Sequence, residues 1–310
     1  MKFIFFLCLL LLTAPVQAAQ TRFERTYTGK NVSLTYHWRD TQGRNNSLLF
    51  QLPKAEVARG NAEFKPFNQV NTQATQEAFA AVEAFIQPYV GKQKKIDLTA
   101  HSNGFRATYY GFKTPEQQEL DAKVRATYQE QFDKTITNNF YMSYGNYVMP
   151  DHRRIAKRYV PAVSPIASAI AAQTKGQGLR GVVDYTLSFL QTIPYDELVS
   201  RQSSNGAGFQ TPYGLLLNNR GDCDTKSVAL AAILRKLYPS QRIVIVYVPE
   251  HAFVGIHATP SRTDYALRLG GEPFILADPT GPHQTRWGVI ETTAEAHLKR
   301  GSYSFQEVPF

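Results

Sequence analysis

The sequence is poor in cysteine, which limits the covalent chemistry open to it. Its 310 residues include two cysteines, Cys8 and Cys223, and Cys8 lies in an N-terminal apolar run. If that run is removed on export, Cys223 remains alone and cannot close an internal disulfide. Because Asp222 and Asp224 flank it, an inert apolar burial site is disfavoured. The residue is better interpreted as a reactive thiol.

Long apolar runs are also lacking. The run from Phe3 to Leu12 has ten residues, whereas a helix needs about 20 to cross a bilayer. Met1-Lys2 supplies a positive charge before the run, and Val16-Gln17-Ala18 offers small residues where a signal peptidase cuts. We therefore expect residues 1–18 to be a signal peptide. The mature protein would be periplasmic or secreted, without a transmembrane span.

The charge is unbalanced toward the positive side, with a formal net charge of +9. We find no interleaving of basic and aromatic residues typical of a nucleic-acid reader, so we expect no nucleic-acid partner. The excess is compatible with contact to acidic surfaces, such as anionic lipids or cell-wall polymers, or with a solubilising role. A hydrophobic content of 43% and an aromatic content of 12% indicate a globular chain rather than a disordered one.

Hydrophobic periodicity predicts the α+β class. Val32, Leu34, Tyr36 and Trp38 alternate with polar residues, which is the period of a half-buried strand. Helical spacing of apolar residues is expected over 71–87, 114–135, 167–173 and 179–190, and strands over 47–52, 95–100, 104–111 and 140–149. We expect residues 19–160 to form a mixed strand-helix N-terminal region and residues 161–310 a second domain.

The second domain has the clearest pattern. Residues 224–238 form an amphipathic helix for which Asp222 is the expected N-cap, so that Cys223 lies in its first turn. Strands are expected over 242–248, 251–258, 265–269 and 274–277. Along 251–258, Ala252, Val254 and Ile256 are expected to face the core, and His251 and Phe253 to face the other way. The pattern is that of one central helix packed on an antiparallel sheet.

Cys223, His251 and Asp278 are the candidate catalytic residues. A helix N-terminus and a neighbouring imidazolium both stabilise a thiolate, and Cys223 stands at a helix start. Asp278, at the end of a strand, would accept the second imidazole N–H and orient the base. The Cys223 N–H is the natural oxyanion donor, and Gln210, in an upstream polar loop, is the candidate for a second.

A zinc site built from the same three residues is the main chemical alternative. It would lack paired Cys or His ligands at short spacing, and we therefore disfavour it. A non-catalytic binding module of the cell envelope that keeps the fold is the alternative from another functional class.

The segments Gly221-Asp222-Cys223, His251-Ala252-Phe253-Val254 and Asp278-Pro279-Thr280 together resemble the transglutaminase-like superfamily of papain-type cysteine enzymes. The resemblance implies a nucleophile helix on an antiparallel sheet, with Cys223 as nucleophile, His251 as general base and Asp278 as its orienter. Gln210-Thr211-Pro212 adds a similarity to exported bacterial members that use calcium. Asp222 and Asp224 match acidic positions of that kind, but Thr225 stands where a further acid is usual.

The sequence thus predicts an exported cysteine enzyme that acts on amide or peptide bonds of protein or peptide substrates through a thioester. Hydrolysis by a protease or amidase is the favoured outcome, because no acceptor-amine site is recognisable. Protein crosslinking by transfer to an amine is the alternative.

Overall fold

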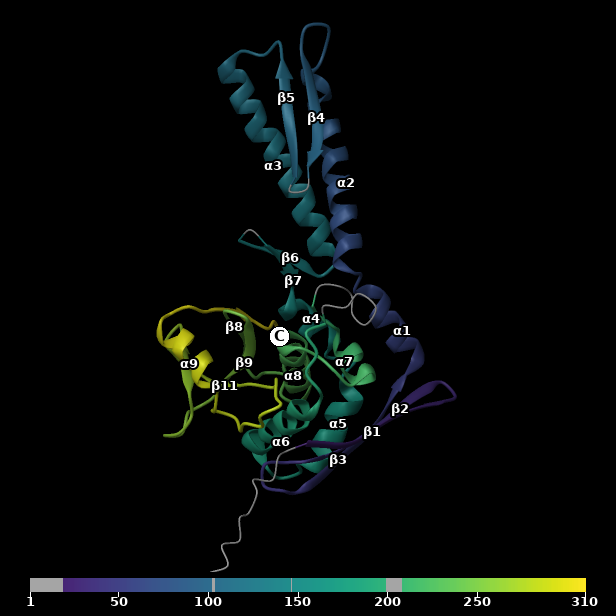
Figure 1. Ribbon diagram of the computed structural model, residues 1–310, viewed down its shortest axis with the longest axis vertical. Coiled ribbons are helices and arrows are strands. Elements are labelled where there is room, and N and C mark those ends of the chain that lie inside the picture. The colour runs from purple at the N-terminus through teal and green to yellow at the C-terminus, as the bar shows by residue number, and fades with distance from the viewer. Residues whose placement is uncertain (1–18, 102–103, 146, 199–207) are drawn as a thin grey trace, which may run out of the picture.

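The computed structural model describes residues 19–101, 104–145, 147–198 and 208–310. The expected signal peptide, residues 1–18, lies outside the described residues. The chain has an α+β architecture with antiparallel sheets. It consists of a globular body from which a long arm projects (Figure 1).

A five-stranded antiparallel sheet forms one side of the body. Its strand order is β10-β11-β9-β8-β12. The strands are β8 (Ile243–Val248), β9 (His251–His257), β10 (Ala266–Leu269), β11 (Glu272–Ala277) and β12 (Ser304–Glu307). Helix α8 (Cys223–Leu237) packs on β8 and β9, as the apolar stripe of the helix predicts.

Both faces of this sheet are buried. Val254 and Ile256 belong to the apolar cluster that contains α8, whereas Phe253 belongs to a second cluster with Ala294 and Leu298 of α9 (Thr292–Lys299). The predicted alternation along β9 is therefore correct. The face that carries Phe253 is covered by a helix of its own, which the alternation alone did not indicate.

The N-terminal strands complete the body. The strands β1 (Ala19–Thr28), β2 (Asn31–Arg39) and β3 (Asn45–Pro53) form an antiparallel sheet, and β2 buries every second residue as predicted. The buried side chains lie in the same cluster as the core of α5 (Ser164–Gln173), α6 (Gly178–Thr192) and α8. The expected division at residues 160 and 161 therefore does not separate two hydrophobic cores.

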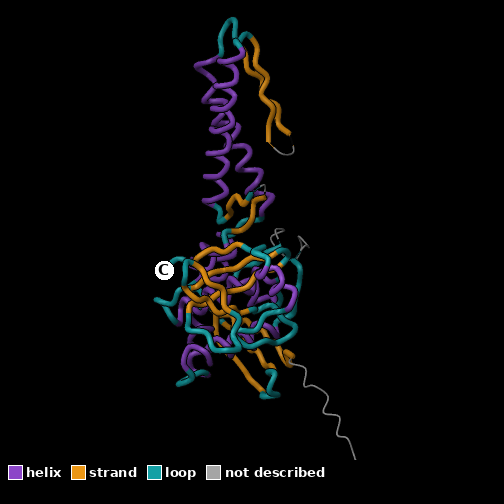
Figure 2. The backbone as a smooth tube through the Cα atoms, turned by 90° about the vertical axis from the view of Figure 1, so that its left-hand side faces the viewer, coloured by secondary structure: helices purple, strands orange, loops and turns teal. Residues whose placement is uncertain are grey.

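The arm is a helical hairpin with a small apolar core of its own. Helices α2 (Phe67–Ile86) and α3 (Thr114–Asn138) run side by side, and the β4–β5 hairpin (Lys95–His101, Gly104–Tyr110) lies along them (Figure 2). The remaining elements are α1 (Lys54–Glu63), η1 (Gln87–Tyr89), β6 (Tyr141–Tyr144), β7 (Tyr147–Pro150), α4 (His152–Tyr159) and α7 (Pro212–Asn218). In the part of the chain that the structure describes, no helix combines the length and apolarity needed to cross a bilayer.

Candidate functional site

Cys223 is the first residue of α8. Asp222 is the N-cap as predicted, and its side chain accepts the Thr225 N–H at 2.9 Å. The cap satisfies one of the backbone donors that a helix N-terminus leaves without an internal partner. The Cys223 sulfur is half-buried and accepts a hydrogen bond from the Ala252 N–H.

His251 and Asp278 are joined by a direct hydrogen bond. The His251 Nε2 lies 2.7 Å from the Asp278 Oδ2, and the other carboxylate oxygen accepts the Thr280 N–H at 3.0 Å. Strands β9 and β11 are antiparallel neighbours, so the start of one and the end of the other meet at the same end of the sheet. Because Nε2 is engaged by Asp278, Nδ1 is the imidazole nitrogen that remains for a substrate or a thiol.

Ala252 of strand β9 is hydrogen-bonded to the first turns of helix α8 through both of its backbone groups. Its N–H donates to the Cys223 sulfur, and its carbonyl accepts the Ser227 hydroxyl at 3.1 Å. Since Ala252 follows His251 directly, the sulfur lies beside the residue that carries the imidazole. The structure thus brings the three predicted residues to one end of the sheet.

Gln210 lies beside the first turn of α8. Its N–H donates to the Thr225 Oγ1 at 3.0 Å, and its side-chain oxygen accepts from Asn218 at 2.8 Å. Its Nε2 is buried and has no hydrogen-bond partner among the described residues. A buried donor of this kind is costly unless another group uses it.

The environment of the thiol differs from the sequence-based expectation. A helix N-terminus was expected to lower the pKa of Cys223. Burial, together with the carboxylates of Asp224 and Asp222, instead raises the pKa, and only the Ala252 N–H acts in the opposite sense. This environment favours the neutral form of the Cys223 thiol over the thiolate.

The acidic neighbours and the histidine are themselves perturbed. Burial and the Asp224 charge raise the pKa of Asp222 to about 7. Burial opposes the charged form of His251, but the hydrogen bond to Asp278 and the charges of Asp278, Glu291 and Asp224 together outweigh it and raise the pKa of the imidazole. Burial likewise opposes ionisation of Asp278, but the hydrogen bond and charge of His251 and the hydrogen bonds from Thr280 together reverse this and lower its pKa. Asp222 therefore titrates near neutral pH, and its charge acts on the Cys223 thiol.

Lys226 is a component of the site that the sequence analysis missed. Its side chain is fully buried, and its ammonium nitrogen donates to the carbonyl oxygens of Ile193, at 2.6 Å, and Thr280. It thereby ties α8 to the end of α6 and to the segment after Asp278. Its position three residues after Cys223, just before the apolar run from Val228 to Leu234 on the same helix, is the signal that could have identified it.

His152 and Tyr195 also approach the site from segments to which the sequence assigned no role. The fully buried His152 ring bonds the Tyr247 hydroxyl at 2.9 Å, and its Nε2 lies 3.6 Å from the Asp224 Oδ2. Tyr195 lines a hollow of about 280 Å³ together with His251 and Asp278. No local pattern could have shown these contacts, because each depends on the packing of distant segments.

Asp222 and Asp224, the two acidic residues that the resemblance matched to a calcium site, are both engaged by protein groups. In the described portion of the chain, no group of three or more His, Cys, Asp or Glu side chains is arranged to hold a metal ion. Asp222 is engaged as a helix cap, and Asp224 faces Cys223 and His152.

Asp224→Asn is expected to increase the reactivity of Cys223. The Asp224 Oδ1 lies 3.6 Å from the sulfur, so removing its charge lowers the thiol pKa and enlarges the thiolate fraction. The side chain is 32% exposed, and with allowance for solvent screening we expect alkylation by iodoacetamide at pH 7 to become about 3–10-fold faster. Asp121→Asn on the arm is the control, and an unchanged rate in Asp224→Asn would contradict the electrostatic argument.

Comparison with protein-family models and with curated proteins finds no match for this chain.

Proposed function

We propose that this protein is an exported cysteine acyl-transfer enzyme of the transglutaminase-like type, acting on amide or peptide bonds of protein or peptide substrates. The observation that carries the proposal is the hydrogen bond between His251 and Asp278, with the Cys223 sulfur held at the neighbouring Ala252 N–H. The packing of α8 on the antiparallel sheet supports a transglutaminase-like core.

The raised thiol pKa favours general-base catalysis over a preformed thiolate–imidazolium pair. In the proposed reaction, His251 Nδ1 takes the thiol proton as the sulfur attacks the amide carbonyl. The imidazolium then gives that proton to the leaving amine, and a thioester remains on Cys223. The ionised Asp278 stabilises the imidazolium that forms in between.

The oxyanion of the tetrahedral intermediate needs donors close to the sulfur. The Cys223 N–H belongs to the first helical turn, whose N–H groups point outward from the helix end. Gln210 Nε2 is the second proposed donor, since it is buried without a partner among the described residues and Gln210 is bonded to the same turn. Two such donors acting together are typical of acyl-transfer sites.

Water is the proposed acceptor of the acyl group, which makes the enzyme a protease or amidase. The test is incubation of cell-envelope protein extracts with the wild type and with Cys223→Ala, followed by mass spectrometry of the products. New peptide termini that require Cys223 are expected. New isopeptide links would instead mean crosslinking, and identical products with both proteins would support a non-catalytic binding module.

A further inference from the structure

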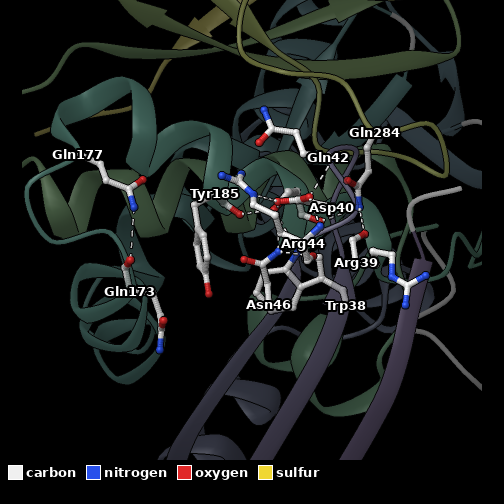
Figure 3. A network of polar contacts seen from close by, with 11 residues as sticks. Trp38, Arg39, Asp40, Gln42, Arg44, Asn46, Gln173, Gln177, Tyr185 and Gln284 are labelled. Atoms are coloured by element: carbon white, nitrogen blue, oxygen red, sulfur yellow. Dashed lines mark hydrogen bonds and ion pairs between the residues drawn. The ribbon is translucent and has the colours of Figure 1, made fainter. Parts of the chain in front are cut away.

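A second hollow on the body, of about 470 Å³, is lined almost entirely by polar side chains. It lies between the β2–β3 turn, helices α5 and α6, and the segment 284–286 (Figure 3). Carboxamides dominate the lining and come from all three segments: Gln42, Asn45, Asn46, Gln173, Gln177, Gln191 and Gln284. The volume falls within the range of about 300–1,000 Å³ that is usual for small-molecule sites.

The β2–β3 turn is held in shape before any ligand binds. The Asp40 carboxylate, 5% exposed, accepts the N–H groups of Gln42 and Arg44, each at 2.9 Å, and the Arg44 Nε at 2.8 Å. These hydrogen bonds outweigh burial and lower the pKa of Asp40. A rigid turn presents its side chains at a lower entropic cost on binding.

One aromatic ring lies among the amides. Tyr185 lines the hollow, and its ring packs against Trp38 at a centroid distance of 5.4 Å. Trp38 in turn donates to the Ser188 hydroxyl at 3.1 Å, and Ser188 also lines the hollow. The aromatic pair supplies an apolar surface with fixed orientation next to hydrogen-bonding groups.

The polar lining is electrically balanced and has unused hydrogen-bonding capacity. The lining contains two acidic residues, Asp40 and Asp184, and two basic ones, Arg44 and Arg286. The Gln284 Oε1 is buried and has no hydrogen-bond partner among the described residues. The exposed carboxamides of Gln42 and Gln177 are the lining groups directly open to a ligand hydroxyl.

We propose that this hollow binds a neutral oligosaccharide. A sugar hydroxyl both donates and accepts hydrogen bonds, and a carboxamide offers both functions to it. The balanced charge gives no advantage to a polyanion, and the Tyr185 ring can cover the apolar C–H face of a sugar ring.

The oligosaccharide site adjoins the proposed active site. The Gln191 Nε2 donates to the Asp278 carbonyl at 2.6 Å, and Gln191 Oε1 accepts the Thr285 N–H at 3.1 Å. Thr285 lines both hollows. A glycan held here would place a linked peptide next to His251. The binding itself needs neither Cys223 nor His251, so it can be tested independently of the proposed reaction.

The test is isothermal titration of the mature protein, wild type and Cys223→Ala, with the N-acetylglucosamine tetramer and with maltotetraose. We expect at least one of them to bind with a Kd of about 1 mM or tighter, equally in both proteins. The double variant Gln42→Ala/Gln177→Ala removes two exposed amides and is expected to weaken binding about 10-fold or more. Gln117→Ala on the arm is the matched control and should leave the Kd unchanged.

Tyr185→Leu provides a second variant, which removes the ring without charge change and should also weaken binding about 10-fold. The proposal is overturned if neither oligosaccharide binds at about 10 mM, or if the double variant and Tyr185→Leu both bind like the wild type. Tighter binding of polygalacturonate than of either neutral oligosaccharide would also overturn it. Loss of binding in Cys223→Ala alone would place the ligand in the acyl-transfer site instead and would equally contradict the proposal.

Discussion

His251→Gln is expected to slow acylation of Cys223 by about 10²–10⁴-fold, which is the range for removal of a general base. Glutamine can still donate to Asp278, but it cannot accept the thiol proton. Because burial and the flanking carboxylates raise the thiol pKa, few sulfurs are ionised at neutral pH without this base. The measurement is the pre-steady-state burst of p-nitrophenolate from p-nitrophenyl acetate, with the adduct on Cys223 verified by mass spectrometry.

His257→Gln is the matched control for this experiment. His257 is at the other end of the same strand, and its Nε2 also faces a carboxylate, Glu272, at 3.0 Å. We expect its acylation rate to stay near that of the wild type, and Cys223→Ala to show no burst above background. Equal losses in the two histidine variants, or no loss in His251→Gln, would rule out the assignment of His251 as the base.

Lys226→Met is expected to lower the free energy of unfolding by about 2–4 kcal/mol at neutral pH. The substitution keeps an unbranched side chain one atom shorter but leaves the buried carbonyl oxygens of Ile193 and Thr280 without their donor. An unsatisfied buried acceptor costs about 1–3 kcal/mol. The costs of the two unsatisfied carbonyl oxygens add. The variant also no longer buries an amine, and this gain offsets part of the added cost. Urea denaturation followed by circular dichroism measures the difference.

The pH dependence of stability gives the same residue a more specific signature. Burial lowers the pKa of Lys226 to about 7, against attractions to Asp278 and Asp222. Between about pH 7 and pH 10 the unfolded chain therefore holds a proton on this lysine that the folded chain has lost. Wild-type stability should gain up to about 1.4 kcal/mol per pH unit from this residue as the pH rises.

Lys226→Met lacks this contribution, so its deficit relative to the wild type should grow toward alkaline pH. Lys236→Met, an exposed lysine on the same helix, is the control and should match the wild-type slope. If the difference in unfolding free energy between the wild type and Lys226→Met stays constant over that alkaline range, Lys226 remains charged in the fold.

Much of the secondary structure follows from short-range pattern. The alternation of β2, the apolar stripe of α8 and the cap at Asp222 were all predictable, because each depends on residues within a few positions of one another. The elements of the arm were also expected separately. Their association into a projecting hairpin was not, since it depends on contacts between α2 and α3 far apart in the sequence.

The division of the chain shows the same limit. The composition and the structure-breaking residues of the sequence favoured a domain boundary near residue 160. Side chains of β2 and α8 nevertheless belong to one hydrophobic cluster. A domain boundary inferred from the sequence marks the place where the patterns that predict helices and strands become weak. Whether two segments share a core depends on which apolar faces meet.

By itself, the sequence pointed to the candidate catalytic residues: a thiol at a helix start, an imidazole on a strand and a carboxylate at a strand end. Only the tertiary structure decided their electrostatic state. Burial and the position of Asp224 raise the pKa of the Cys223 thiol, and the packing of α8 against α6 buries Lys226 beside it. Hydrogen-bonding propensity is local, whereas desolvation depends on everything that surrounds a group in the folded chain.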